Sequence, residues 1–141
     1  MKLVDVAYLA GLIDGEGTIT LVRETKFRKP SVSIASTSFE LVSWCKETVG
    51  AGTIASKRLY KSHHKKSYTW TVKFQTAVKV IEKVLPFLRE PEKKRRALLI
   101  IENYDSITVR NGKYTQAQIL KKEKFEKTFF KNSERFHASN L

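Results

Sequence analysis

The segment from Val4 to Asp14 limits the folds available to this chain, because it is apolar on almost every side of the helix that its spacing predicts. One side carries Val4, Ala7, Tyr8, Gly11 and Leu12, and the other carries Leu9, Ala10 and Ile13. A helix of this composition needs burial on both sides. The stretch that follows, residues 18–24, changes to a period near two, which predicts a half-buried strand.

The rest of the chain predicts one antiparallel sheet with helices on a single face. Helical spacing covers 4–14, 39–49, 77–88, 91–104 and 115–130, and alternating strands cover 18–24, 31–36, 53–60 and 67–75, with a basic turn at 26–30. Gly50 and Gly52 predict the end of the second helix, and Pro91 fits the first turn of the fourth. The order α-β-β-α-β-β-α-α-α is an α+β fold whose other sheet face is left to solvent or a ligand.

The length and charge of the chain narrow the class of protein. Its 141 residues suit one domain. The 27 Lys and Arg against 14 Asp and Glu give a net charge of +13, which indicates a polyanionic partner, although a merely basic surface is the alternative. Nucleic acid fits better than a membrane, because the apolar runs are far shorter than a membrane span. The single Cys45 excludes an internal disulfide and a Cys-based zinc cluster.

Residues 8–17, with the sequence YLAGLIDGEG, form the most specific motif. This block resembles the LAGLIDADG motif: residues 9–14 are identical to its first six letters, and Gly15, Glu16 and Gly17 stand for its last three. The order α-β-β-α-β-β-α over about 5–104 is also similar to the core of the LAGLIDADG homing endonucleases. We therefore expect one domain with that core and a C-terminal helical extension over about 105–141.

Small residues in the motif favour the pairing of two copies. Gly11 and Gly15 are four residues apart, which lets one helix backbone approach another closely. One chain holds one copy of the motif, so a C₂ homodimer is expected. The alternative is that Ala10 and Gly11 pack only within their own chain. The expected interface residues are Leu9, Ala10, Gly11, Ile13 and Asp14.

Carboxylates at the end of the motif predict a metal site. Two copies of Asp14 and Glu16 would bring four acidic groups together on a basic protein, which is costly unless cations bind. Mg²⁺ suits such oxygen ligands and completes its shell with water and phosphate oxygens, and Mn²⁺ or Ca²⁺ could substitute for binding. The resemblance implies that Glu16 is the ligand and that Gly15 offers its carbonyl. Asp14 is expected to cap or order a turn instead.

The resemblance also implies helper residues. A basic residue near the start of the helix after the turn at 86–88 is expected to stabilise phosphate charge, and both Lys93 and Lys94 fit that position. A solvated basic face is the alternative for both lysines. Ser36, at the end of the second strand, falls near a polar family position that positions water.

Polar positions on the strands are expected to read base edges in the major groove, and lysines on the turns to contact phosphates. The strand residues are Thr18, Thr20, Val22, Glu24, Ser31, Ser33, Lys57, Thr69, Thr71 and Lys73, and the turn residues are Lys26, Arg28, Lys29, Lys61, Lys65 and Lys66. A strand of about eight residues spans about eight base pairs. A surface feature explains His63 and His64 better than a metal site does, and the lysines of 121–131 could be solvated or contact phosphate.

These inferences predict a site-specific, metal-dependent DNA endonuclease that acts as a homodimer on a long pseudo-palindromic site and hydrolyses phosphodiester bonds. The alternative is an intron maturase or another DNA- or RNA-binding protein that does not cut. We expect an intracellular location, in a prokaryotic cytoplasm or nucleoid or in an organelle, and an intron-encoded or free-standing gene.

Overall fold

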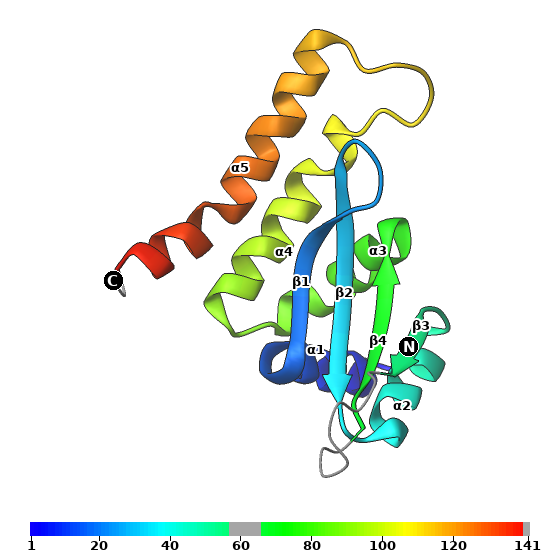
Figure 1. The fold of residues 1–141 in the computed structure, drawn as a ribbon. Coiled ribbons are helices and arrows are strands. Elements are labelled where there is room, and N and C mark those ends of the chain that lie inside the picture. The colour runs from blue at the N-terminus through cyan, green and yellow to red at the C-terminus, as the bar shows by residue number, and fades with distance from the viewer. Residues whose placement is uncertain (57–65, 140–141) are drawn as a thin grey trace.

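Four strands form one antiparallel sheet built from two hairpins (Figure 1). The computed structural model describes residues 1–56 and 66–139, with side chains as far as residue 131. Strands β1 (Gly17–Arg23) and β2 (Arg28–Ser36) form the first hairpin, and β3 (Thr53–Ser56) and β4 (Tyr68–Lys73) form the second. The order across the sheet is β1-β2-β4-β3, so β2 and β4 are its central strands.

Four helices cover one face of this sheet, and the fifth lies outside them (Figure 1). The covering helices are α1 (Leu3–Glu16), α2 (Phe39–Val49), α3 (Phe74–Val84) and α4 (Pro91–Asn103). Helix α5 (Gln116–Ser139) packs against α4, and two short 3₁₀ turns, η1 (Leu85–Phe87) and η2 (Asp105–Ile107), flank α4. The predicted α+β order is confirmed, and no helix of the described residues lies on the other face of the sheet.

Local signals in the sequence set the ends of two helices. Ser38 caps the N-terminus of α2, where its hydroxyl accepts a hydrogen bond from the Leu41 N–H at 3.2 Å, and Gly50 ends the helix with φ of 78°. The carboxylate of Glu90 caps α4 by accepting from the N–H groups of Glu92 and Lys93. The predicted bounds of α2 and the predicted start of α4 are therefore confirmed.

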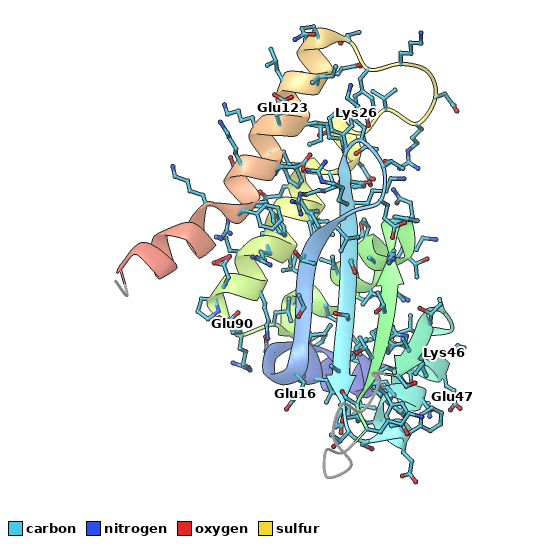
Figure 2. The ribbon with its side chains drawn as sticks, in the orientation of Figure 1. Glu16, Lys26, Lys46, Glu47, Glu90 and Glu123 are labelled. Atoms are coloured by element: carbon cyan, nitrogen blue, oxygen red, sulfur yellow. The ribbon has the colours of Figure 1, made fainter. Side chains whose placement is uncertain are left out.

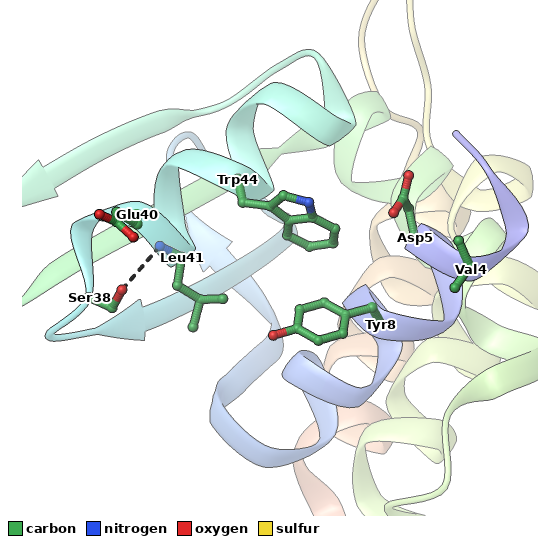
Figure 3. A pocket seen from close by; sticks show the side chains of 7 residues that line it. All are labelled: Val4, Asp5, Tyr8, Ser38, Glu40, Leu41 and Trp44. Atoms are coloured by element: carbon green, nitrogen blue, oxygen red, sulfur yellow. Dashed lines mark hydrogen bonds between the residues drawn. The ribbon is translucent and has the colours of Figure 1, made fainter.

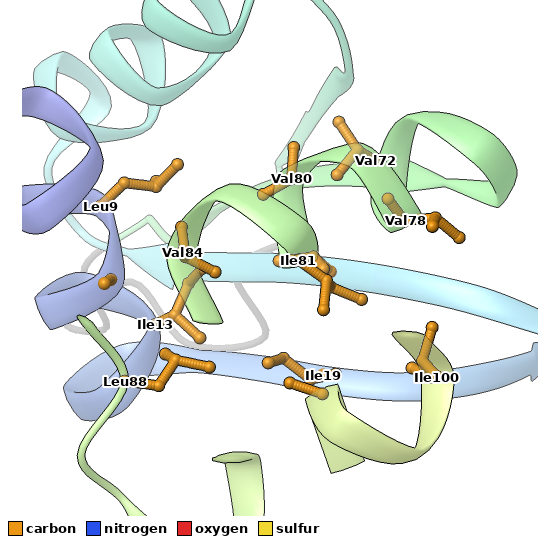
Figure 4. Close-up of a cluster of buried hydrophobic side chains, with 14 of the residues drawn as sticks. Leu9, Ile13, Ile19, Val72, Val78, Val80, Ile81, Val84, Leu88 and Ile100 are labelled. Carbon is orange, nitrogen blue, oxygen red and sulfur yellow. The ribbon is translucent and has the colours of Figure 1, made fainter. Parts of the chain in front are cut away.

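The core lies between the covered sheet face and the helices, and it is filled by apolar side chains that alternate along the strands and by apolar side chains of the helices (Figure 4). The buried residues on this face alternate along the strands: Ile19 and Leu21 in β1, Val32 and Ile34 in β2, and Trp70 and Val72 in β4. From the helices, Leu9 and Ile13 of α1 and Ile81 and Val84 of α3 pack against these strands with no exposed surface. This arrangement leaves the intervening polar residues on the open face.

The structure corrects the prediction at two junctions. The strand predicted to reach Gln75 ends at Lys73, because Phe74 adopts a left-handed φ of 59° and begins α3. Apolar alternation continues through Phe74, so the pattern alone does not show this turn. The predicted turn at 26–30 is also too long, because β2 begins at Arg28 and pairs it with Arg23. The part of the predicted third strand beyond Ser56 lies outside the described residues.

Candidate metal site and nucleic-acid interface

Glu16 is the last residue of α1, and it is exposed where the chain passes into β1 (Figure 2). The next residue must be glycine, because a Cβ on Gly17 would lie 2.7 Å from the Cα of Ile13 and 3.2 Å from the carbonyl oxygen of Ser33. The sharp change from helix to strand therefore depends on Gly17. It holds Glu16 at the end of the sheet.

The oxygen atoms at this helix end fit a hard divalent cation, but one chain offers few of them. The Gly15 carbonyl is among the last four of α1, which have no partner within the helix. Across residues 1–56 and 66–131, no three His, Cys, Asp or Glu side chains are grouped so as to hold a metal ion. A cation bound by Glu16 and Gly15 would take its other ligands from water, a phosphate or a second copy of the chain.

Lys93 reaches the same helix end from α4. Its ammonium donates hydrogen bonds to the carbonyl oxygens of Ile13 at 2.8 Å and Asp14 at 2.7 Å. A cation at the C-terminal end of a helix is stabilised by the helix dipole. Lys94 is exposed on the next position of α4. The structure therefore brings Lys93, and not Lys94, against the end of α1 that carries Glu16, and the catalytic role of either lysine stays a prediction.

Asp14 orders a turn that is remote in sequence. Its two carboxylate oxygens accept hydrogen bonds from the backbone N–H groups of Arg89 at 3.0 Å and Glu90 at 3.1 Å. The prediction that Asp14 orders a turn rather than binding metal agrees with these contacts. Glu90, which the sequence reasoning missed, then caps α4 and fixes the position of Lys93. The pair Glu90-Pro91 at a helix start is the signal that could have revealed it.

Ser36 lies at the end of β2, two residues beyond Ile34, which is paired with Gly17. Its hydroxyl oxygen accepts a hydrogen bond from the Ser38 N–H at 3.0 Å, so it helps to order the turn into α2. Ser36 shares the side of β2 that carries Ile34, the side covered by helices. Its role in positioning water stays a prediction.

Polar side chains form cross-strand rows on the open face of the sheet. Register places them together, since Thr18 pairs with Ser33 and Ser33 with Thr71, while Thr20 pairs with Ser31. The full set predicted for this face and found on it is Thr18, Thr20, Val22, Ser31, Ser33, Thr69, Thr71 and Lys73. Glu24 follows β1 and forms an ion pair with Lys73. The open face thus carries hydrogen-bonding groups and few apolar ones.

The predicted phosphate-binding residues divide into three groups. Lys26 in the first hairpin turn, Lys29 on the open face and Lys66 before β4 occupy the sheet margin, and Lys26 and Lys66 are exposed. Arg28 is placed differently: its guanidinium lies 3.5 Å from Glu126 and over the ring of Phe130, so it faces α5 rather than the open face. Arg28 faces this way because its position on β2 has the parity of the covered face, so the structure gives no support to a phosphate contact by Arg28 from the open face. Lys61 and Lys65 form the third group, which lies outside the described residues, as do the predicted strand residue Lys57 and the histidines His63 and His64.

The predicted dimer interface needs correction as well. Leu9, Ala10 and Ile13 have no exposed surface in the single chain, so they pack in its own core and cannot contact a second copy. Asp14 is bound to the turn before α4. Of the five predicted residues, Gly11 alone is exposed. A Cβ added at Gly11 or Gly15 would meet nothing within 4 Å, so both are open for close approach by another helix.

A groove between α1 and α2, lined by apolar side chains together with Asp5, Ser38 and Glu40, adjoins this exposed stripe of α1 (Figure 3). Val4 and Tyr8 are 70% and 54% exposed, which is unusual for large apolar side chains. The Tyr8 ring meets Trp44 of α2 edge-on with centroids 5.0 Å apart. The exposed side of α1 is therefore apolar at Val4, Tyr8 and Gly11, and it is a different side from the one predicted for the interface.

The described residues support neither a reactive cysteine nor a membrane-spanning helix. Burial raises the pKa of the Cys45 thiol to about 11, which excludes a thiolate nucleophile at neutral pH. A search of the described helices finds none that is both long enough and apolar enough to cross a membrane.

Comparison with known proteins finds solved structures of similar fold. No family model and no curated protein matches the chain. The homing endonuclease I-CvuI in complex with its target aligns with a TM-score of 0.56 and 18% identity, covering 86% of this chain and 92% of that one. The archaeal intron-encoded homing endonuclease I-Vdi141I complexed with DNA gives a TM-score of 0.52 and 16% identity over 87% and 97%. I-SmaMI bound to an uncleaved DNA target gives 0.56 and 14% over 89% and 45%.

Proposed function

This chain has the fold of the LAGLIDADG homing endonucleases, and on that premise we propose that it is a site-specific, divalent-metal-dependent DNA endonuclease that acts as a homodimer. The observation that carries the proposal is the position of Glu16. An exposed carboxylate stands at the end of α1, at the margin of an open polar sheet face, and the ammonium of Lys93 binds the carbonyl of Asp14 two residues earlier. The solved structures with this fold include complexes of homing endonucleases with DNA.

The sheet would bind the DNA. Its open face presents Thr, Ser and Lys side chains, which donate and accept hydrogen bonds to base edges, and lysines at its margin suit phosphates. The net charge of +13 favours this partner. The alternating strands therefore supply specificity, and the charge supplies affinity for the backbone.

Cleavage of both strands needs two sites, and each chain has one Glu16. Two copies that pack through Val4, Tyr8 and Gly11 would bring the ends of both α1 helices together, each with its own carboxylate. The Glu16 carboxylate and the Gly15 carbonyl would hold Mg²⁺, which when bound activates water and stabilises charge on the scissile phosphate. Lys93 would keep a positive charge next to that phosphate.

The test compares the wild type with Glu16→Gln on a library of long double-stranded DNA sites. We expect the wild type to cut in Mg²⁺ and the variant to bind the same sites in Ca²⁺ without cutting. Glu47→Gln, on the exposed surface of α2, is a matched control and should cut normally. Cutting by Glu16→Gln would refute the assigned site. Binding without cutting by the wild type would instead favour a binding protein.

A further inference from the structure

An ion pair crosses the open face of the sheet at its far end from Glu16. Glu24 follows β1 and Lys73 ends β4, and their side chains form a salt bridge. Strand β2 lies between these two strands, so the bridge passes over β2. The pair is accessible, with 43% of the Lys73 side chain and 34% of the Glu24 side chain exposed. It stands on the same face as the polar rows.

The surroundings of the pair hold it in place. Ser31 lies under this end of the face, paired with Lys73, and is only 4% exposed although it is polar. The neighbouring cation, Lys29, lies over the ring of Phe74 at 4.6 Å, whereas the Glu24 carboxylate pairs with Lys73. Phe74 itself has a left-handed φ of 59°, a conformation that a bulky residue adopts rarely and that often marks a functional position. Two cations and one carboxylate are thus arranged in fixed partnerships.

An exposed ion pair adds little to stability, so its value to this chain lies in what it presents to a ligand. Lys73 offers donors and Glu24 offers acceptors, side by side on strands that are about 10 Å apart. In the major groove a G·C pair offers two guanine acceptors, N7 and O6, and one cytosine donor, N4. An A·T pair puts a thymine acceptor and methyl group where the carboxylate would need a donor.

We propose that Glu24 and Lys73 together read one G·C base pair in each half of the DNA target, with Lys73 on the guanine and Glu24 on the cytosine. This inference rests on the proposed function. Glu24 follows Glu16 by eight residues along an extended strand, so the base pair lies about eight positions from the cleaved bond. The ion pair holds the two groups side by side before DNA binds, and on binding they exchange their mutual contact for contacts to one base pair.

The test is a selection from double-stranded palindromic oligonucleotides with randomised half-sites, using the full chain in Ca²⁺ so that binding is read without cutting. The variants are Glu24→Gln, Lys73→Met and the double variant, and the matched control is Lys26→Met in the exposed turn. The three changed side chains are all exposed, and circular dichroism verifies the fold of each of the four variants. Sequencing of the bound fraction gives the base preference at every position.

We expect the wild type to prefer G·C at one outer position of each half-site. Each single variant should weaken that preference by about tenfold or more at the same position, and the double variant should weaken it no further. Lys26→Met should lower affinity for all sequences alike. The proposal is overturned if the preference survives Glu24→Gln, or if Lys73→Met lowers affinity for all sequences alike. If the wild type enriches no sequence at all, the proposed DNA-binding function fails and this inference fails with it.

Discussion

The ammonium of Lys93 lies 2.7 Å from the carbonyl oxygen of Asp14, so a side chain from α4 donates a hydrogen bond to the C-terminal end of α1. The Asp14 carboxylate in turn binds the backbone that precedes α4. These reciprocal contacts fix the helix end that carries Glu16 relative to the sheet. The site therefore depends on contacts between segments that are about 80 residues apart, as the separations of 79 and 76 residues show.

Substitution of Lys93 should affect cleavage more than DNA binding. Lys93→Met removes the cation next to the proposed phosphate position, and we expect the cleavage rate to fall by about 100-fold. Loss of a charged hydrogen bond to the helix end should also lower the free energy of unfolding by about 1 kcal/mol. Single-turnover cleavage in Mg²⁺, binding in Ca²⁺ and urea unfolding measure the three effects separately.

Lys94→Met is the matched control, because Lys94 is exposed on the next position of the same helix. It should cut DNA at nearly the wild-type rate. Equal losses of cleavage for the two variants would contradict the choice of Lys93 and point to a general effect of charge on DNA affinity.

Gly11 should govern assembly rather than folding. A Cβ there meets nothing within the chain, so Gly11→Leu should leave the unfolding free energy of the single chain unchanged or slightly raised, as helix propensity favours leucine over glycine. In a dimer that packs through this face the leucine would hold the helices apart. We expect a shift from dimer to monomer in analytical ultracentrifugation and a parallel loss of double-strand cleavage.

Lys79→Leu places the same side chain on an exposed position of α3 and is the control for added apolar surface. It should remain dimeric. A Gly11→Leu protein that stays dimeric and cuts both strands would show that another surface joins the subunits.

The sequence predicts the sheet well because a period of two is a local property. Thr18 and Thr20 alternate with Ile19, and the structure places the threonines on the open face and Ile19 in the core. A period of two does not predict the end of β4 at Lys73, because the apolar alternation continues through Phe74 although the backbone there adopts a left-handed conformation. Periodicity describes faces of an element and does not fix where the element ends.

Other parts of the site depend on contacts that the sequence does not display. The partners of Asp14 and Lys93 lie far away along the chain, and only the fold brings them together. Which residues of α1 are exposed is the most difficult feature to predict from the sequence. Ala10 and Gly11 are neighbours of similar size, yet Ala10 has no exposed surface and Gly11 is exposed. A helix that is apolar on every side does not reveal from its sequence which side faces its own core.

Gly52 is expected to be less replaceable than Gly50. Both have positive φ, 108° and 78°, but only at Gly52 would a Cβ collide with other atoms, the Trp70 ring nitrogen and the Thr71 carbonyl oxygen at 2.9 Å. The Trp70 ring is buried and donates to the Ala51 carbonyl at 3.0 Å, so it has no room to move. Gly50→Ala should cost about 1 kcal/mol and Gly52→Ala at least twice that in urea unfolding. Equal costs would contradict this packing.

Lys122 should make stability depend on pH. Its side chain is almost fully buried on α5, where the ammonium donates to the Thr108 hydroxyl at 2.7 Å and lies 4.4 Å from the centre of the Tyr104 ring. Burial lowers the pKa of Lys122 to about 8 from its usual 10.5, with Glu126 opposing the shift and Lys29 adding to it. Because the unfolded chain holds this proton more tightly, stability is lowest below pH about 8 and rises as the pH increases towards 10.5.

The unfolding free energy of the wild type should therefore gain on the order of 2 kcal/mol relative to Lys122→Met as the pH rises from about 7 to about 10. Measuring the difference between the two proteins cancels the titration of other lysines. Burial raises the pKa of Tyr104, which destabilises the fold only above the usual tyrosine pKa of 10, so the window is set below that value. Parallel pH profiles for the two proteins would mean that Lys122 keeps its ordinary affinity for the proton, and that α5 opens to solvent around it.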